Sequence, residues 1–326
     1  DRPVFIIAPP RSGSTLLFET LSRASQIWSL GDEGHGILER HRELCPRPSS
    51  VDSNRLLASH CPAALGKTIR DDFCQLVRDR QGRSVAETGA TSIRLLEKTP
   101  KNILRIPFVL ELFPDARFIY LYRDARDNIS SIIDGWLSGR FVTYNRQTRH
   151  GPWSFLLPPQ WHEHTGDDLA GIAAFQWAAC HRYAIEDLTK LDSSRWHALN
   201  YAEFIADTEL AVERLCQFME VPVDEQLRAH CRGTLPTSRY TLSEPAVGKW
   251  QRHAQELAPK MAAAGAMCEQ VNRFVAGQSQ LLATELEIAL TAQPAKRKIG
   301  RNESCPCGSK KKYKQWLADN EGERGK

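Results

Sequence analysis

The sequence predicts an α/β fold, a P-loop-type parallel sheet flanked by helices, and two observations support this prediction. Short apolar runs alternate with longer stretches of helical periodicity along most of the chain, an order that is typical of a parallel sheet covered on both faces. Two of the apolar runs lead through a short polar loop straight into a helix. With 326 residues, 41% of them hydrophobic, the chain can bury one large core and carry an appendage.

Five short runs have the composition of buried strands. The first reads Val-Phe-Ile-Ile, and an uninterrupted apolar run of this length is typical of a strand in a parallel sheet. The predicted strands cover residues 4–7, 84–86, 93–97, 118–122 and 196–201.

Helical periodicity fills the intervals between the strands. The helix at 102–113 has a clear start, because Thr99 suits the N-cap and Pro100 suits the first helical position. Residues 291–298 contain a proline among basic residues and are typical of a linker. The predicted helices cover residues 14–24, 67–80, 102–113, 127–138, 171–191 and 208–219, followed by a long alanine-rich helical stretch at 253–290.

The loop after the first strand has the features of an anion site. It reads Pro-Pro-Arg-Ser-Gly, and a helix is predicted from Ser14 onward. Gly13 permits a positive φ, and the free N–H groups and positive dipole end of the helix then face the loop, which suits a phosphate or a sulfate. The nucleoside-triphosphate motif G-x-x-x-x-G-K-[ST] is excluded, because Gly13 replaces its lysine and Arg11 is the only cation of the loop. An ordinary strand-to-helix turn is the alternative.

A second pair of residues suits a second phosphate. Arg123 closes the strand at 118–122, and Ser131 lies about two turns into the helix that follows. An arginine fork and a serine hydroxyl can hold one phosphate from two sides. A surface ion pair between Arg123 and Asp127 is the alternative interpretation.

In this order and spacing, Arg11-Ser-Gly-Ser-Thr15 and the pair Arg123…Ser131 resemble the two cofactor motifs of the sulfotransferase family. The resemblance covers about residues 1–255 and implies the sulfotransferase fold and the co-substrate 3′-phosphoadenosine 5′-phosphosulfate (PAPS), with 3′-phosphoadenosine 5′-phosphate (PAP) as product. It implies that Arg123 and Ser131 hold the 3′-phosphate. It also implies that the first motif holds the 5′-phosphosulfate, through Arg11, Ser12, Gly13, Ser14 and Thr15.

Two more cofactor contacts follow from the resemblance. Leu-Asn-Tyr-Ala-Glu-Phe around Tyr201 resembles a strand end whose tyrosine contacts the adenine side. Gly-Lys-Trp around Lys249 resembles a late segment that reaches a phosphate of the nucleotide. Packing and surface roles are the alternatives for these two residues.

Sulfuryl transfer needs cations at the leaving phosphate oxygen and a base for the acceptor hydroxyl. Arg11 suits the first task, and so does Lys98, which directly follows the strand at 93–97. The carboxyl ends of strands line the ligand crevice of an open α/β sheet. A solvated lysine at a helix entry is the alternative for Lys98, and Lys101 points less clearly to the site.

For the base, the segment Ser29-Leu-Gly-Asp-Glu-Gly-His35 resembles the Gly-Glu-Glu segment of tyrosylprotein sulfotransferases. Allowing a one-residue insertion, the resemblance implies that Glu33 is the catalytic base, with Asp32 and His35 as rivals and an acidic helix cap as the structural alternative. Cytosolic sulfotransferases use a histidine in a Lys-Thr-His motif. Here Pro100 follows Lys98-Thr99, which favours the carboxylate class.

Aromatic residues gather on a segment rich in glycine and proline between residues 136 and 161. They suit either the wall or lid of a substrate site, or a loop that packs its own rings on the body. They are Trp136, Phe141, Tyr144, Trp153, Phe155 and Trp161.

Charge and cysteine content bear on the surroundings of the chain. The net charge is +4, but eight basic residues and one acid lie between 296 and 314, which leaves 35 basic and 38 acidic residues elsewhere. The nine cysteines are mostly scattered singly, which favours reduced thiols in a cytoplasm over a disulfide framework.

No apolar window approaches the roughly 18 residues of a membrane span. No signal peptide is visible, although the chain opens at Asp1 and removal of an upstream segment stays open.

The basic tail has its own resemblance. Residues 299–318 resemble the SEC-C motif, a small zinc module at the C-termini of bacterial proteins; Cys305 and Cys307 match its first ligand pair, but Trp316 and Leu317 replace the second. Two thiolates fall short of the four ligands of a structural zinc site, so we expect no metal here unless other ligands complete it. Weak contact with a ribosome, nucleic acid or chaperone is one expectation for the basic charge, and a merely solvated tail is the other.

These observations predict a sulfotransferase domain at 1–290, a linker at 291–298, a degenerate SEC-C-like motif at 299–318 and a tail at 319–326, in a bacterial, cytoplasmic protein. The predicted function is transfer of the sulfuryl group of PAPS to a hydroxyl without a required metal. A sugar, a lipid, a peptide tyrosine and a small alcohol or phenol all stay open as acceptor. The alternatives are a non-catalytic adaptor that binds PAP or works through its tail, and a P-loop kinase, against which the missing lysine argues.

Overall fold

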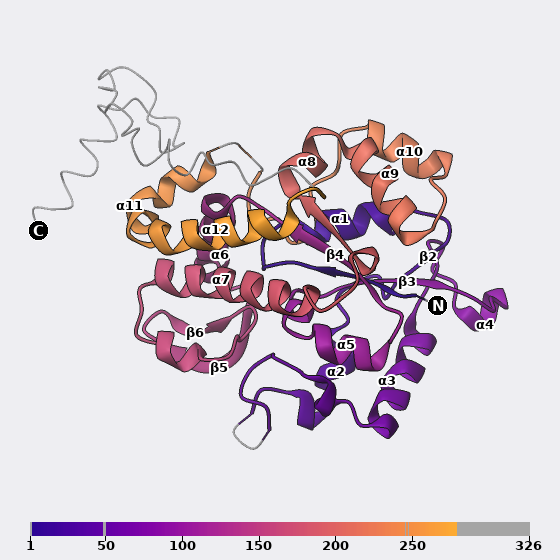
Figure 1. Cartoon of the computed structure of the whole chain (residues 1–326), viewed down its shortest axis with the longest axis horizontal. Helices are drawn as coiled ribbons and strands as arrows, with labels where there is room; N and C mark the ends of the chain where they lie inside the picture. The colour runs from indigo at the N-terminus through magenta and orange to yellow at the C-terminus, as the bar shows by residue number, and fades with distance from the viewer. Residues whose placement is uncertain (1, 48–49, 245, 247, 279–326) are drawn as a thin grey trace, which may run out of the picture. The chain divides into compact units, whose positions relative to one another are not determined.

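A five-stranded parallel sheet forms the centre of the fold in the computed structural model, with strand order β2-β3-β1-β4-β7 (Figure 1). The structure describes residues 2–47, 50–244, 246 and 248–278. The chain divides into two units, 1–283 and 284–326, and the predicted linker and SEC-C-like motif lie outside the described residues. The strands are β1 (Val4–Ile7), β2 (Ile27–Trp28), β3 (Arg94–Lys98), β4 (Arg117–Tyr122) and β7 (Trp196–Asn200).

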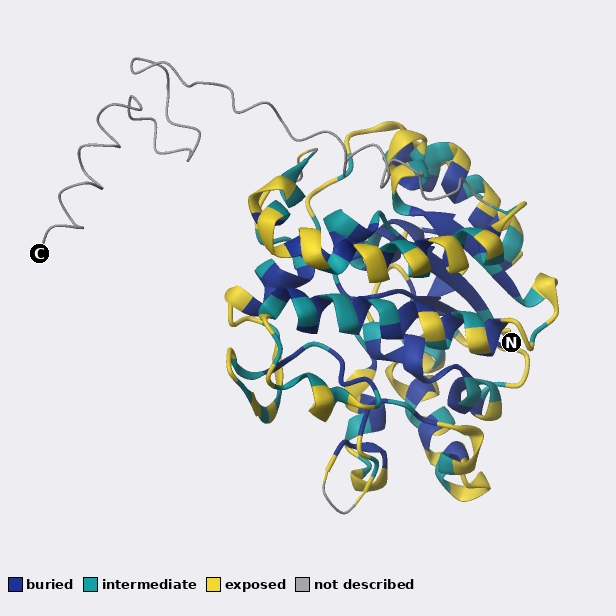
Figure 2. Cartoon of the chain, turned by 60° about the vertical axis from the view of Figure 1, so that its left-hand side comes forward, coloured by how far each residue is buried: buried dark blue, intermediate teal, exposed yellow. Residues whose placement is uncertain are grey.

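Helices cover both faces of the sheet, which confirms the predicted α/β class. Side chains alternate along a strand, so Val4 and Ile6 of β1 share one face, where they belong to the same apolar cluster as residues of α1 (Ser14–Leu21) and α9 (Thr208–Met219). On the opposite face Phe5 contacts Phe113, at the end of α5 (Ile106–Leu112). Figure 2 shows that the strands between these layers are buried.

Further helices and an antiparallel hairpin complete the described part of the chain. The hairpin pairs β5 (Val142–Thr148) with β6 (Gly151–Ser154). The remaining α-helices are α2 (His35–Glu39), α3 (Ala63–Leu76), α4 (Val85–Thr88), α6 (Ala125–Leu137), α7 (Leu169–Leu188), α8 (Tyr201–Ala206), α10 (Glu225–Arg232), α11 (Ala254–Leu257) and α12 (Met261–Val275). Short 3₁₀ helices lie at Arg42–Leu44, Ala58–His60, Pro100–Leu104, Trp161–His164, Ser193–Arg195, Lys249–His253 and Ala258–Lys260. None of the helices in this part of the chain is long and apolar enough to span a membrane.

The predicted strand at 84–86 is wrong, because these residues begin α4. The Ser84 hydroxyl accepts from the Glu87 N–H, and the Glu87 carboxylate accepts from the Ser84 N–H. This is a capping box, a helix start that outweighs the strand preference of a few residues. The strand predicted to Tyr201 also stops earlier, because the Asn200 side chain caps α8.

Two predicted helices are broken where proline removes a backbone donor. The helix at 102–113 divides into the 3₁₀ helix Pro100–Leu104 and α5, which has a proline in its first turn. Thr99 occupies the N-cap position, but its hydroxyl makes no cap. The described part of the 253–290 stretch likewise forms α11, the 3₁₀ helix Ala258–Lys260 and α12.

Candidate active site

The loop between β1 and α1 has the sharp turn that the sequence predicts. Gly13 has a φ of 94° and Arg11 a φ of 66°, both in the left-handed region that L side chains rarely adopt. A Cβ on Gly13 would lie 2.2 Å from Cε2 of Tyr201, so the backbone here requires glycine. Asn128 of α6 holds the loop, because its Nδ2 donates to the carbonyl of Pro10 at 2.7 Å.

Three predicted site residues from different elements meet at the N-terminus of α1. Lys98, at the end of β3, is 2% exposed, and its Nζ donates to Oε1 of Glu33 at 2.6 Å and to Oγ1 of Thr15 at 3.1 Å. We call this set the Thr15–Glu33–Lys98 network. Lys98 is therefore not a solvated lysine at a helix entry, because its charge is buried against the predicted base.

The rival bases lie on different sides of Glu33. His35 Nδ1 is 3.5 Å from Oε2 of Glu33, so it belongs to the same cluster. Asp32 is exposed and turns away, because its carboxylate accepts from the hydroxyl of Tyr240 at 3.0 Å. Burial opposes the charge of Glu33, but the hydrogen bonds and charges of His35 and Lys98 outweigh it and hold the pKa of Glu33 below its ordinary value.

A buried glutamate that sequence reasoning missed anchors the loop that carries Glu33. Glu97 is 1% exposed, and its Oε1 accepts from the N–H of Gly34 at 3.1 Å. The Thr99 hydroxyl accepts from the same N–H at 2.9 Å and donates to Glu97. Burial raises the pKa of Glu97 despite these bonds. The sequence did contain a signal for this residue, because a glutamate inside an apolar strand is a charge that needs buried partners.

Arg11 is a half-buried cation with a free donor. Its Nη1 donates to the carbonyl of Tyr240 at 2.7 Å, and its guanidinium lies 5.0 Å from the ring centre of Phe141. Its Nε is buried and has no partner among the described residues. Burial lowers the pKa of Arg11 to about 10, with a smaller contribution from the charge of Arg123. A guanidinium that is close to a second positive charge and has an unused N–H donor is suited to bind an anion.

Arg123 lies beside the same loop and also keeps a free donor. Its Nη2 is 3.5 Å from Oδ2 of Asp127, so the ion-pair interpretation is present in the structure. Its guanidinium covers the ring of Tyr201 at 4.8 Å, yet its buried Nε has no partner among the residues described. Ser131 lies four residues after Asp127 on α6 and therefore shares its helix face. The ring of Tyr201 also packs directly against the backbone of Gly13.

Lys249 and Lys101 are engaged elsewhere. The Nζ of Lys249 donates to Oγ of Ser243 at 2.5 Å and to the carbonyl of Glu244 at 2.7 Å, so it holds its own loop. Burial lowers the pKa of Lys249, and the charges of nearby arginines, Arg123 among them, add to this effect. Lys101 donates to Oε1 of Glu39 at 2.6 Å.

The aromatic segment at 136–161 both packs on the body and reaches the site. Trp153 is fully buried, and Trp136 donates from its ring N–H to Gln176. Phe141 instead lies beneath Arg11 and stacks on Phe155, with ring centres 4.9 Å apart. The two tryptophans are core residues, whereas Phe141 is part of the candidate site.

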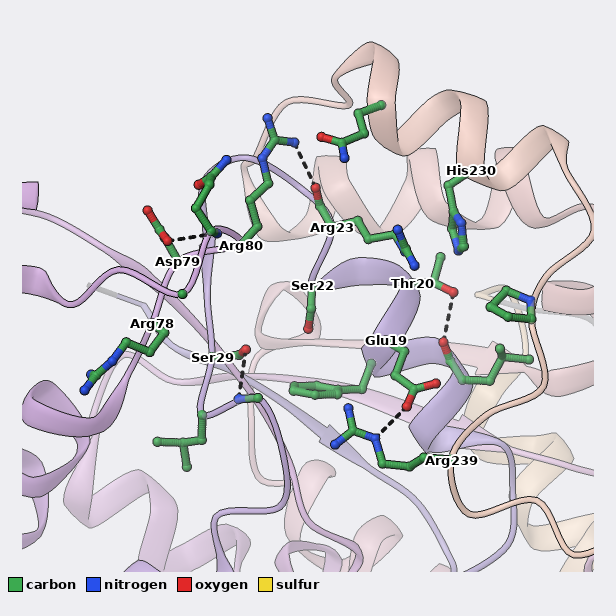
Figure 3. Close-up of a pocket in the computed structure, with 18 residues that line it drawn as sticks. Glu19, Thr20, Ser22, Arg23, Ser29, Arg78, Asp79, Arg80, His230 and Arg239 are labelled. Carbon is green, nitrogen blue, oxygen red and sulfur yellow. Dashed lines mark hydrogen bonds and ion pairs between the residues drawn. The ribbon is translucent and has the colours of Figure 1, made fainter.

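A cavity of about 780 Å³ lies along α1, between this helix, α10 and the turn at 78–82 (Figure 3). None of the Thr15–Glu33–Lys98 network lines it. Two of its arginines are already paired, Arg239 with Glu19 and Arg80 with Asp224. The described residues contain no group of three or more metal-ligating side chains, and Cys305 and Cys307 lie outside them.

Comparisons with known proteins identify the family of the chain. A model of the sulfotransferase family matches residues 3–225, and a model of the SEC-C motif matches residues 301–315. An uncharacterized protein of Aquifex aeolicus is 22% identical over 79% of this chain and 31% of its own length. A protein-tyrosine sulfotransferase of Drosophila melanogaster is 23% identical over 70% of this chain and 40% of its own length. The chain thus spans less than half of either relative.

Solved structures include the sulfotransferase domain of the Synechococcus PCC 7002 olefin synthase, 19% identical, with a TM-score of 0.44 over 80% of this chain and 94% of that one. A mouse sulfotransferase complexed with PAP is 13% identical, with a TM-score of 0.41 over 82% and 86%. The family model spans the loop at 9–13, the network around Lys98 and the pair Arg123 and Ser131. The chain therefore belongs to the sulfotransferase family.

Proposed function

We propose that the protein transfers the sulfuryl group of PAPS to a hydroxyl of an acceptor. The observation that carries this proposal is the Thr15–Glu33–Lys98 network, in which a hydroxyl, a carboxylate and a buried cation meet at the N-terminus of α1. Membership of the sulfotransferase family supports it.

The residues around the loop fit the two anionic ends of PAPS. Arg11 and Arg123 each keep a buried Nε without a partner among the described residues, and a buried donor of this kind favours an incoming anion. We assign the 5′-phosphosulfate to Arg11–Thr15 and the 3′-phosphate to Arg123 and Ser131. Tyr201 then faces the adenine side, and Lys249 adds a phosphate contact by leaving its own loop. When bound, PAPS supplies an activated sulfuryl group.

The chemistry assigned to the chain's own residues is a proton transfer and a charge neutralisation. Glu33 takes the proton of the acceptor hydroxyl while the acceptor oxygen bonds to sulfur, and the bond from sulfur to the 5′-phosphate oxygen breaks. Arg11 and Lys98 neutralise the charge that grows on this oxygen. As Lys98 turns from Glu33 toward the leaving oxygen, the basicity of Glu33 rises, because the charge that lowers its pKa moves away.

The test is incubation of the protein with ³⁵S-labelled PAPS, a tyrosine-containing peptide and an extract of the producing cells. A peptide tyrosine is the first acceptor to try, because two relatives are named protein-tyrosine sulfotransferases; a sugar, a lipid and a small alcohol or phenol follow through the extract. We expect label in one acceptor and thermal stabilisation by PAP. Stabilisation by ATP instead of PAP would favour a kinase, and PAP binding without any transfer would favour the adaptor.

Arg123→Ala is expected to weaken PAP binding about ten- to a hundredfold, because a hydrogen bond to a charged group contributes about 1.5–3 kcal/mol. Isothermal titration calorimetry measures the change. Arg117→Ala is the matched control, since Arg117 begins the same strand and pairs with Glu220 at 2.7 Å. Equal affinities in both variants would contradict the assignment of the 3′-phosphate.

The pH profile of kcat/KM is expected to identify the base, because this ratio reports the pKa values of the free enzyme, in which Lys98 still contacts Glu33. A carboxyl whose pKa is lowered in the folded protein stays ionised down to that pKa, so transfer should hold from neutral pH and fall only below the ordinary value of 4.5. A histidine base would place this fall at about pH 6.5. Initial rates after short pH jumps decide between the two, and recovery of the rate at pH 7 excludes denaturation.

A further inference from the structure

Tyr240 contacts three parts of the candidate site at once. Its carbonyl accepts from Nη1 of Arg11 at 2.7 Å, and the centre of its ring lies 5.6 Å from Nζ of Lys98. Its hydroxyl donates to Asp32, at 3.0 Å from Oδ1 and 3.2 Å from Oδ2. It lies beyond residues 3–225, the part that the family model matches.

The hydroxyl of Tyr240 reaches the predicted base through one carboxylate. Oδ1 of Asp32, which accepts from Tyr240, also accepts from the backbone N–H of Glu33 at 2.8 Å. On the other side, the N–H of Gly34 donates to Glu97 and to the hydroxyl of Thr99. Glu33 therefore sits between two anchors, a buried one on β3 and an outer one at Tyr240.

The phenol keeps the proton that this outer anchor needs. Burial, the hydrogen bond to Asp32 and the charge of Asp32 together raise the pKa of Tyr240 to about 12, so the hydroxyl stays a donor at neutral pH. The face of the ring attracts the Nζ of Lys98, which lies 5.6 Å from its centre. Phe141 supports the ring edge-on, with ring centres 6.4 Å apart.

We propose that Tyr240 is a positioning residue for sulfuryl transfer, one that holds the loop of Glu33, the ammonium of Lys98 and the guanidinium of Arg11 in one arrangement. This inference rests on the proposed function. Tyr240 acts through these three groups and does not itself exchange a proton with the acceptor. The segment after α10, which carries Tyr240, thus becomes part of the candidate active site.

Two variants separate the contacts of Tyr240. Tyr240→Phe removes only the hydroxyl bond to Asp32, whereas Tyr240→Leu also removes the ring over Lys98, and both keep the carbonyl that binds Arg11. Tyr183→Leu is the matched control, because the ring of Tyr183 also lies against cations. Its centre is 4.7 Å from the guanidinium of Arg55 and 4.9 Å from that of Arg182.

The first readout is the pKa of Glu33, measured by ¹³C NMR of carboxyl-labelled glutamate and assigned through Glu33→Gln. A loosened loop weakens the contacts with Lys98 and His35 that lower this pKa. We therefore expect the pKa of Glu33 to rise in Tyr240→Phe, to rise further in Tyr240→Leu, and to stay unchanged in Tyr183→Leu. This reading needs no acceptor and decides the assignment by itself.

The second readout is transfer from labelled PAPS, with PAP affinity and melting temperature measured alongside. Transfer is expected to fall about three- to tenfold in Tyr240→Phe and about 30- to 100-fold in Tyr240→Leu, while PAP affinity in Tyr240→Phe stays within about threefold of the original. An unchanged pKa of Glu33 in both Tyr240 variants, or the same rise in Tyr183→Leu, would overturn the inference. Absence of PAP binding in the unaltered protein would overturn the proposed function instead, and the NMR reading would still report whether Tyr240 holds Glu33.

Discussion

Glu33→Gln is expected to lower the rate of sulfuryl transfer by about 10²–10⁴-fold. The amide keeps the shape of the side chain and can still accept from Nζ of Lys98, which lies 2.6 Å from Oε1 in the structure. It cannot take a proton from the acceptor, so the bond to sulfur must form without a base. PAP affinity is expected to stay within about threefold, because the residues assigned to the nucleotide are untouched. Single-turnover transfer and calorimetry measure the two quantities.

The neighbours of Glu33 provide the controls. His35 is 3.5 Å from the Glu33 carboxylate and Asp32 faces Tyr240, so His35→Ala and Asp32→Asn should each cost less than Glu33→Gln. Normal transfer in Glu33→Gln together with a collapse in His35→Ala or Asp32→Asn would move the base to that neighbour. Loss of PAP binding in Glu33→Gln would show instead that Glu33 is structural.

The sequence predicts that several candidate site residues lie close together, and the sheet explains why. Arg11 and Arg123 follow β1 and β4, and Lys98 is the last residue of β3. These strands are adjacent in the order β3-β1-β4. The carboxyl ends of parallel strands meet at one edge, so residues at these ends converge once the strands are recognised. Strand recognition is reliable here because β1 and β4 are almost wholly apolar and buried.

Residues that depend on tertiary partners were not predictable in this way. Glu97 lies within an apolar strand, which indicates that its carboxylate has buried partners, but only the fold identifies them as the N–H of Gly34 and the side chain of Asn102. The hydroxyl of Tyr240 meets Asp32 across 208 positions of sequence. No local pattern carries such a contact, since it depends on how the segment after α10 returns to the sheet.

Short elements were missed for a different reason. β2 has two residues, too few for an alternation to stand out. α10 is mostly polar and buries only Leu227 and Cys231, so its apolar stripe is sparse. The aromatic hairpin at 142–154 shows register shifts between its strands, which break the alternation that marks a strand. The capping box at Ser84 was readable, because Ser-x-x-Glu is a local signal.

Lys98→Met is expected to lower the rate of transfer by about 10²–10³-fold, because it removes a buried cation from the oxygen on which charge develops. Methionine fills a similar volume without charge. Lys98 also lowers the pKa of Glu33, so its loss should raise this pKa and move the acidic fall of the pH profile to higher pH. Single-turnover rates across pH measure both effects.

Lys101→Met separates these effects from the general cost of deleting a buried lysine. Lys101 donates to Glu39 at 2.6 Å, the distance of the Lys98–Glu33 pair, and the two side chains are 8% and 2% exposed. Lys101→Met should therefore lower the melting temperature and move the pH profile much less than Lys98→Met, because Lys98 acts on Glu33 through both a hydrogen bond and its charge. Equal loss of transfer in the two variants would show that both pairs, Lys98–Glu33 and Lys101–Glu39, merely support the fold. A loss of rate in Lys98→Met with an unmoved profile would limit Lys98 to the leaving oxygen, because a lysine that also tunes the base must shift both.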